Sequence, residues 1–271
     1  MALALPHTLS PSKVSAFKDC ALAFRFSVID RLPEPPSAAA VKGTLVHRAL
    51  EQLYCAEPSA RTRAAALAAL RQAFDHARHH DGEYRQLGLE PEAEELLQTD
   101  AEHLVHRYFE MEDPTSIRPI GIELLLEAKL DGVRVRGIID RLELDAEGEL
   151  VVTDYKTGRA PAPRYEQGRC GGVHFYAFLC EAMLGRRPAR VQLLYLGDGV
   201  TIVATPSQQS VRGLASRVGA VWQAVERACA CDDFRPHPGP LCDWCAFQAY
   251  CPAFGGDPSQ ARQGQLASAG V

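Results

Sequence analysis

The stretch GIIDRLELDAEGELVVTDYKTG, residues 137–158, decides the fold. Two largely apolar runs, 138–144 and 150–157, flank the turn sequence DAEGE, and this pattern predicts two antiparallel strands joined in a hairpin. The second run is apolar almost up to Asp154, which is therefore expected at the end of a buried strand. Because a buried charge needs a partner or a metal ion, the end of this strand is a candidate functional site.

The turn decides which residues of the two strands face each other. If Gly148 closes a three-residue loop in the left-handed conformation, counting outward from the turn sets Asp140 directly opposite Asp154. Directly opposed residues share a face with their Cβ atoms about 5 Å apart, and Lys156 shares that face because it lies two residues further on. A shift of one residue in register would undo this arrangement.

Two carboxylates that close together repel each other unless a cation lies between them. Their oxygen ligands suit Mg²⁺ or Mn²⁺. Such a site can hydrolyse a phosphodiester, because metal ions polarise the phosphate and lower the pKa of a bound water. Lys156 would orient that water or offset the negative charge of the transition state. The alternative is a structural ion pair between Lys156 and the two aspartates.

The rest of the chain alternates between helical and strand periodicity, which predicts a mixed α/β core with helical flanks. Helices are predicted from Ser10 towards Cys20, from about Thr44, near 60–80 and 91–112, over 172–184, and after 205. Strands are predicted over 122–130, 133–144, 150–157, 191–196 and 200–205. Residues 31–40 form a proline-rich connector, Gly137 suits a bulge, and the tail over 254–271 is expected to be disordered.

The composition excludes a disordered, collagen-like or fibrous protein, because 46% of the 271 residues are hydrophobic and 23% are charged. The net charge is −5, so any surface for a nucleic acid would have to be a local basic patch. No segment reaches the roughly 18 continuous apolar residues of a membrane helix. The first residues lack the basic region of a signal peptide, and we expect a cytoplasmic protein.

The chain has nine cysteines, and in a reducing compartment a cysteine cluster suggests a metal before a disulfide. Cys242, Cys245 and Cys251 supply three ligands within a short span, a spacing that both zinc and iron–sulfur sites use. A fourth thiolate is required. Cys229 and Cys231 compete for that place locally, and a compact zinc knot with one of them is the interpretation that spacing alone favours.

The motifs resemble those of the PD-(D/E)xK nuclease superfamily and, within it, RecB-family exonuclease domains. The matching segments are LSPSKVSAFKDC, GTLVHRALEQLY, GIIDRLEL, DYKTG and LCDWCAFQAYC, which follow one another in the family's order. The resemblance implies a restriction-endonuclease-like mixed β-sheet flanked by helices. It implies a single nuclease domain over 8–253, with a catalytic core of about 42–205 and cluster-binding ends of about 8–30 and 230–253.

The resemblance also assigns roles to individual residues. It implies that His47, Asp140, Asp154 and the backbone carbonyl of Tyr155 hold Mg²⁺ or Mn²⁺, and that Lys156 is catalytic together with the two aspartates. Taken by itself, a histidine that borders an apolar helical stripe is more often a core residue. The family's motif is what favours a metal ligand at His47.

One position departs from the family's pattern. The family usually has a glutamine four residues before a tyrosine on the helix after the hairpin, and here Tyr176 is preceded by Gly172. His174 or Gln167 could substitute for the missing amide. Candidate DNA-binding residues around the site are Arg159, Arg164, Arg169, Tyr176, Arg186, Arg187 and Arg190. The alternative for each arginine is a solvated loop charge.

For the cysteines, the resemblance selects Cys20 as the fourth ligand, around a 4Fe–4S cluster like that of AddB-type and CRISPR-associated nucleases. Such a cluster would join the two ends of the chain. Zinc at the same four residues is the alternative.

These features together predict a metal-dependent DNA exonuclease that acts on single-stranded DNA or DNA ends, in DNA repair, recombination or processing. No GxxxxGK[ST] loop occurs, so any unwinding would come from a separate helicase chain. The alternative is a catalytically impaired DNA-binding or partner-docking module that retains the nuclease fold and the cluster, and Gly172 favours it.

Overall fold

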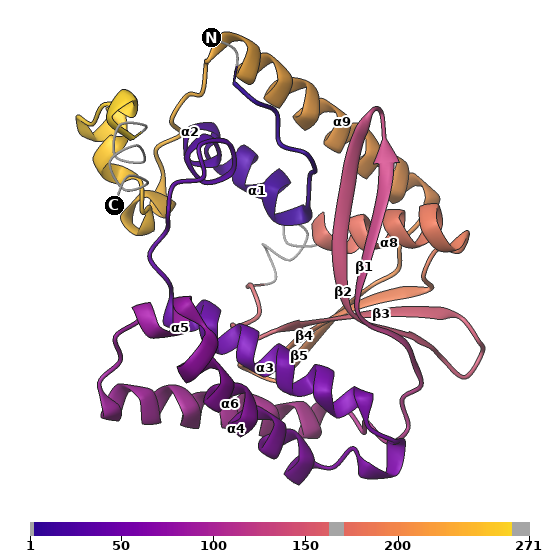
Figure 1. Ribbon diagram of the computed structural model, residues 1–271. Coiled ribbons are helices and arrows are strands. Elements are labelled where there is room, and N and C mark those ends of the chain that lie inside the picture. Colours follow the sequence, from indigo (N-terminus) through magenta and orange to yellow (C-terminus); the bar gives the residue numbers. More distant parts are fainter. Residues whose placement is uncertain (1–2, 163–170, 262–271) are drawn as a thin grey trace. The chain divides into compact units, whose positions relative to one another are not determined.

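The computed structural model describes residues 3–162 and 171–261 (Figure 1). The chain divides into two compact units. The terminal unit is formed by Met1–Pro35, Glu127–Arg136 and Arg212–Val271, and the sheet unit by Pro36–Leu126 and Gly137–Val211. The sheet unit spans nearly the range predicted for the catalytic core, and the terminal unit holds both predicted cluster-binding ends. The single domain over 8–253 stays a prediction.

One mixed sheet has the strand order β1-β2-β3-β4-β5. Its strands are β1 (Pro119–Leu130), β2 (Val133–Leu144), β3 (Leu150–Lys156), β4 (Arg190–Tyr195) and β5 (Val200–Ala204). Strands β2 and β3 are antiparallel, β3 and β4 are parallel, and β4 and β5 are antiparallel. The parallel step needs a crossover connection, and the helix α8 (Gly171–Leu184) lies within it. The mixed α/β architecture predicted from the sequence is therefore confirmed.

The β2–β3 hairpin has the predicted turn. The Asp145 amide donates to the Glu149 carbonyl at 3.0 Å, and the Gly148 amide donates to the Asp145 carbonyl at 3.0 Å. Gly148 has a φ of 75°, the left-handed conformation that a residue without Cβ adopts most readily. The resulting register pairs Arg141 with Thr153. Asp140 and Asp154 each lie one position beyond this pair on their strands, which agrees with the register that the turn chemistry predicts.

The sheet unit has a layer of helices whose apolar faces form one buried cluster, and α3, α4 and α6 run beside one another in Figure 1. The helices are α3 (Ala38–Cys55), η2 (Pro58–Ala60), α4 (Arg63–His80), α5 (Gly82–Gln86) and α6 (Pro91–Met111). The prediction that the α3 helix starts near Thr44 was wrong, because the helix begins at Ala38. Three alanines directly follow the proline-rich stretch, and alanine is the best helix former.

The terminal unit joins the two ends of the chain through an apolar core. Phe24 and Phe26 from the N-terminal segment pack in one buried cluster with Val225 and Phe247 from the C-terminal segment. Its helices are α1 (Pro11–Asp19), α2 (Ala21–Phe24), η1 (Arg25–Ile29), α9 (Gln208–Cys231), η3 (Pro240–Trp244), η4 (Gln248–Tyr250) and η5 (Pro252–Phe254). Ser10 caps α1 as predicted, since its side chain accepts from the Lys13 amide.

Two local predictions were wrong. At Gly137 the alternation of strand β2 continues without a change of phase, since Val135, Gly137 and Ile139 are all buried. A Cβ at Gly137 would lie 3.0 Å from a methyl group of Leu179 on α8, so this glycine permits a close approach of helix and strand. The tail is not wholly disordered either, because residues 258–261 are helical and Ala261 is 1% exposed within the terminal core.

Within the described part of the chain, no helix combines the length and apolar character that crossing a membrane requires.

Candidate active site

The site is built on β2 and β3, where Asp140 and Asp154 lie one position beyond the paired residues Arg141 and Thr153. Both residues are buried, with 8% and 3% of their surface exposed. Burial raises the pKa of Asp140, and the nearby Asp154 carboxylate raises it further, because each makes the charged form of Asp140 less favourable. A cation bound between these two buried carboxylates would stabilise both of them.

The main chain of Tyr155 holds two of the site's side chains. Its amide donates to Asp140 Oδ2 at 2.6 Å. Its carbonyl oxygen lies 3.1 Å from Nε2 of His47, which reaches the site from α3. The other ring nitrogen, Nδ1, lies 3.6 Å from Asp140 Oδ1. His47 is therefore not a core histidine, and the structure brings it together with Asp140 and the Tyr155 carbonyl.

Glu123 on β1 completes this group. Its Oε1 lies 3.8 Å from Nδ1 of His47, and the candidate ligand atoms of His47, Glu123 and Asp140 all lie within 4.8 Å of one another. Burial lowers the pKa of His47, but its contacts with Asp140 and Glu123 outweigh burial and raise the pKa to about 10. The carboxylates of Asp140 and Glu123 thus make the surroundings of the imidazole strongly negative, and such surroundings would also stabilise a bound metal cation.

Sequence reasoning missed Glu123. The period-two pattern of its strand assigns it to a solvated face, which gives no reason to expect a site there. In the structure its φ is 44°, in the left-handed region that side-chain-bearing residues rarely adopt. Backbone strain of this kind concentrates at functional sites. The residue types around Glu123 gave no indication of its positive φ.

The second half of the site surrounds Asp154. Lys156 Nζ forms an ion pair with Asp154 Oδ2, and the hydroxyl of Tyr176 on α8 donates to Asp154 Oδ1 at 2.8 Å. Burial lowers the pKa of Lys156, but the Asp154 charge outweighs this and raises it, so the ammonium stays protonated at neutral pH. The Lys156 side chain is 43% exposed, and it is therefore accessible to a substrate.

The donor set fits a hard divalent cation. It consists of carboxylate oxygens, a main-chain carbonyl and one imidazole, and it contains no thiol. Oxygen-rich sites of this kind suit Mg²⁺ or Mn²⁺ better than softer metals.

The candidate DNA-binding arginines fall into three groups. Arg159 is exposed and lies three residues beyond the end of β3, whereas Arg164 and Arg169, like Gln167, lie outside the described residues. Arg186, Arg187 and Arg190 lie near the start of β4.

The structure does not bring this last group to the carboxylates. Arg190 is paired with Val151 at the start of β3, whereas Asp154 is paired with Leu193. Three residues of strand separate the two pairs, about 10 Å at 3.3 Å per residue. Each of the three arginines also contacts a carboxylate, on Glu149, Glu181 and Asp145 respectively.

Gly172 lies one helical turn before Tyr176 on α8. A Cβ built at Gly172 would have no atom of the described residues within 4 Å, so among these residues nothing blocks the first side-chain atom at this position. His174, one of the two residues considered as a substitute, is half-buried on the same helix.

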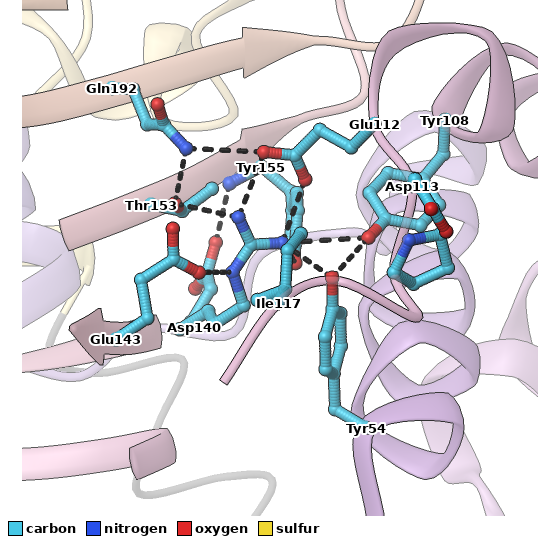
Figure 2. A network of polar contacts seen from close by, with 12 residues as sticks. Tyr54, Tyr108, Glu112, Asp113, Ile117, Asp140, Glu143, Thr153, Tyr155 and Gln192 are labelled. Carbon is cyan, nitrogen blue, oxygen red and sulfur yellow. Dashed lines mark hydrogen bonds and ion pairs between the residues drawn. The ribbon is translucent and has the colours of Figure 1, made fainter. Parts of the chain in front are cut away.

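A buried arginine, Arg141, supports the site from the opposite face of the sheet. Arg141 follows Asp140 on β2 and points to the opposite face of the sheet, and none of its surface is exposed. Its guanidinium binds both carboxylate oxygens of Glu112, at 2.7 and 2.9 Å, and its Nε lies 2.6 Å from Glu143. Figure 2 shows these groups converging on the guanidinium, with further contacts from Tyr54, Tyr108, Thr153 and Tyr155.

Tyr155 links this network to the metal site. Arg141 Nη1 donates to the Tyr155 hydroxyl at 2.8 Å (Figure 2), while the main chain of the same tyrosine holds Asp140 and His47. The Arg141 network therefore fixes the position of Tyr155, whose main chain in turn orients Asp140 and His47.

The four cysteines predicted as cluster ligands line one cavity of about 320 Å³ in the terminal unit: Cys20, Cys242, Cys245 and Cys251. Main-chain amides contact two of the sulfurs. The His237 amide donates to Cys20 Sγ at 3.4 Å, and the Gly239 amide donates to Cys242 Sγ at 3.3 Å. Burial raises the pKa of the Cys245 thiol, and the other three thiols raise it further.

The two competing cysteines do not line this cavity. Cys229 packs in the apolar core of the terminal unit, and Cys231 is exposed at the end of α9.

Comparison with known proteins gives partial matches to curated proteins, among them a phage protein and a helicase/nuclease protein. The chain is 31% identical over 135 residues to the Gene 69 protein of Mycobacterium phage L5, which covers 49% of this chain and 44% of the phage protein. It is 36% identical over 75 residues to an ATP-dependent helicase/nuclease protein of Pelotomaculum thermopropionicum, covering 27% of this chain and 6% of that protein. The chain thus spans less than half the length of the phage protein and a small part of the helicase/nuclease protein.

The fold and the family are matched over most of the chain. A crystal structure of a candidate exonuclease from Eubacterium rectale superposes with a TM-score of 0.56 at 11% identity, covering 88% of this chain and 87% of the other. At that identity the likeness shows a shared fold. The sequence model of the PD-(D/E)XK nuclease superfamily matches residues 8–252. With nearly its whole length matched and with Asp140, Asp154 and Lys156 gathered at one hairpin end, this chain belongs to the PD-(D/E)XK nuclease superfamily.

Proposed function

We propose that the protein is a Mg²⁺- or Mn²⁺-dependent DNA exonuclease that acts on single-stranded DNA or free DNA ends. The observation that carries this proposal is the opposition of two buried carboxylates, Asp140 and Asp154, with a protonated Lys156 beside them. A structural ion pair would account for Lys156 and Asp154. It would not account for the additional negative groups gathered around His47.

We assign the metal ligands to His47, Asp140, Asp154 and the Tyr155 carbonyl, with Glu123 as an additional carboxylate within reach. A bound Mg²⁺ or Mn²⁺ supplies Lewis acidity toward the phosphate and lowers the pKa of a coordinated water. The protein's part is to hold the ligands rigidly. The Tyr155 amide orients Asp140, and the Tyr176 hydroxyl orients Asp154.

Lys156 is assigned the role of the electrostatic catalyst. Asp154 keeps its ammonium protonated and aimed at the site. From there the ammonium can hydrogen-bond to the scissile phosphate or to the attacking water, and it offsets the charge that develops in the transition state. Removing one such donor from an active site typically lowers kcat by about 10²–10³.

The test is cleavage of end-labelled single-stranded DNA by the purified full chain with Mn²⁺. We expect Lys156→Ala and Asp154→Ala each to lower the rate by at least about 10², with unchanged thermal unfolding of Lys156→Ala. Lys129→Ala is the matched control, because Lys129 likewise lies two positions after an acidic residue, Glu127, but belongs to β1 and not to the β2–β3 hairpin. Cleavage by Lys156→Ala at the wild-type rate would remove the catalytic assignment.

We further propose that Cys20, Cys242, Cys245 and Cys251 hold a structural 4Fe–4S cluster. The support is that these four thiols line one cavity and that two of them accept main-chain hydrogen bonds, a common feature around cluster sulfurs. Zinc at the same four residues remains the alternative, and metal content together with a visible spectrum distinguishes the two. The proposal assigns the protein to the cytoplasm, where thiols stay reduced.

We propose that the protein acts in DNA repair, recombination or processing, with unwinding supplied by a separate helicase chain. The partial similarity to a helicase/nuclease protein supports this pairing.

A second candidate function is a catalytically impaired DNA-binding or partner-docking module. Gly172 favours it, because a glycine cannot supply the side-chain amide that the family usually has at this position.

A further inference from the structure

The terminal unit contains a basic pocket that takes no part in the metal site. This cavity of about 560 Å³ is lined by five basic side chains and one acidic one: His7, Lys13, Arg31, Arg134, Arg136 and Glu127. The chain as a whole carries a net charge of −5. The basic side chains here are therefore a local concentration against an acidic background.

The pocket is a consequence of how the N-terminal segment joins strand β2. The Leu9 amide donates to the Arg134 carbonyl, and the Arg136 amide donates to the Leu9 carbonyl, both at 2.9 Å. Residues 133 and 135 are buried, so strand alternation turns both arginines toward solvent on the same side. The bridge at Leu9 sets the first turn of α1, and with it Lys13, beside those two arginines.

Two of the basic side chains, Lys13 and Arg136, have no carboxylate beside them among the described residues. Arg134 contacts Glu127 at 3.2 Å. Lys13 Nζ donates to the Thr8 carbonyl at 3.1 Å, and no carboxylate of the described residues lies within ion-pairing distance of Lys13 or Arg136. Burial lowers the pKa of Lys13, and Arg136 and Arg31 lower it further, because the neighbouring positive charges repel the ammonium. An anion in the pocket would relieve this repulsion.

We propose that this pocket binds the phosphodiester backbone of a single DNA strand, as an anchoring site separate from the metal centre. The identity of the strand rests on the proposed nuclease function. Guanidinium groups form paired hydrogen bonds to phosphate oxygens, whereas a lysine offers a point charge, and the pocket combines both. Four permanently basic side chains spread over its wall fit successive phosphates of a strand better than one small anion.

The test is fluorescence anisotropy of a labelled oligo(dT) with the full chain in EDTA, so that binding is measured without cleavage. We expect the double variant Lys13→Ala/Arg136→Ala to bind roughly ten-fold more weakly at low salt. The slope of log K against log salt should fall by about 1.4, because each neutralised phosphate contributes about 0.7 for single strands.

The matched control is Lys18→Ala/Arg235→Ala. It removes the same two charge types from positions of the same unit that do not line the pocket. It should retain the wild-type slope. Equal losses in the two double variants, or an unchanged slope in Lys13→Ala/Arg136→Ala with wild-type thermal unfolding, would overturn the proposal.

Two further arms distinguish the possible outcomes. Inorganic phosphate should not displace the oligonucleotide beyond its effect as a salt, and full displacement at low millimolar phosphate would mean a small-anion site instead. Cleavage of the same oligonucleotide by the wild type and the pocket variant is measured in parallel with Mn²⁺. If the wild type binds but does not cleave, the nuclease proposal fails while this one stands; if it cleaves and the pocket variant binds normally, only this one fails.

Discussion

The sheet unit and the terminal unit bring their functional groups together in different ways. In the sheet unit, Asp140 and Asp154 meet because a three-residue turn fixes the register of two consecutive strands. In the terminal unit, the Cys20 thiol accepts a hydrogen bond from an amide 217 positions away in the sequence. The pair of aspartates is therefore encoded locally, whereas the cysteine site exists only once the two chain ends have packed together.

The two units also differ in the packing that supports their sites. The carboxylates are held on one face of a sheet whose other face carries a dense buried polar network around Arg141. The cysteines lie beside an apolar core that already joins the chain ends. We therefore expect a substitution of a cysteine ligand in the terminal unit to lower the stability of the whole chain. In the sheet unit, we expect a substitution in the Arg141 network to lower stability and also to disturb the metal site.

The largest effect on stability is expected from Cys20→Ser. A cross-link around a loop of about 100 residues contributes roughly 4–5 kcal/mol in the chain-entropy model, and metal binding by four thiolates is coupled to folding. The variant should lose its visible absorption, unfold at a lower temperature and cleave more slowly. Metal analysis, a visible spectrum and a melting curve measure this.

Cys231→Ser is the control, because Cys231 is exposed and does not line the cysteine cavity. It should behave as the wild type. A colourless wild type with one zinc per chain would replace the cluster with a zinc site. If Cys20→Ser then kept its zinc and its melting temperature, the fourth ligand would have to be another residue.

The next largest effect is expected from Arg141→Met, which keeps much of the side-chain volume but removes the charge. Glu112 and Glu143 would be left without their cation, and removing one partner of a buried pair typically costs about 3–5 kcal/mol. Because Arg141 also anchors Tyr155, the variant should bind Mn²⁺ more weakly as well. Thermal unfolding and Mn²⁺ titration measure the two effects.

Arg107→Met provides the comparison for this variant. Arg107 pairs with Glu110 at 3.1 Å on the exposed face of α6, and a surface pair of this kind contributes about 0–1 kcal/mol. Equal melting temperatures for the two variants would show that the Arg141 network does not support the sheet unit.

The sequence predicts the features that depend on local turn chemistry, and it does not predict those that depend on tertiary packing. The hairpin register was predictable because Gly148 and the residues around it form a turn whose geometry depends on local chemistry. Glu123 was not, because its positive φ removes it from the strand's simple alternation. Arg141 gave no signal either. Its partner Glu112 follows α6, while Gln192, which bonds to Glu112 and Thr153, lies on β4, and only tertiary packing brings these elements together.

In the terminal unit, spacing alone favoured the local candidates Cys229 and Cys231 over Cys20. Spacing could not indicate this cavity, because sequence separation carries no information about which chain ends will pack together. The family resemblance selected Cys20, and the cavity lined by Cys20, Cys242, Cys245 and Cys251 accords with that choice.

The smallest effect is expected from Gly172→Gln, and it sharpens the comparison within the sheet unit. A Cβ at this position meets no atom of the described residues within 4 Å, and we expect the variant to fold normally. Residues four apart share a helix face, and Tyr176 already contacts Asp154, so the new amide would extend beside the site. We expect a rate increase of a few-fold. Gly172→Ala is the control, because it makes the same backbone change without the amide. If Gly172→Gln and Gly172→Ala cleave DNA at the same rate, the position plays no part in holding the substrate, and Gly172 ceases to be an argument for an impaired enzyme.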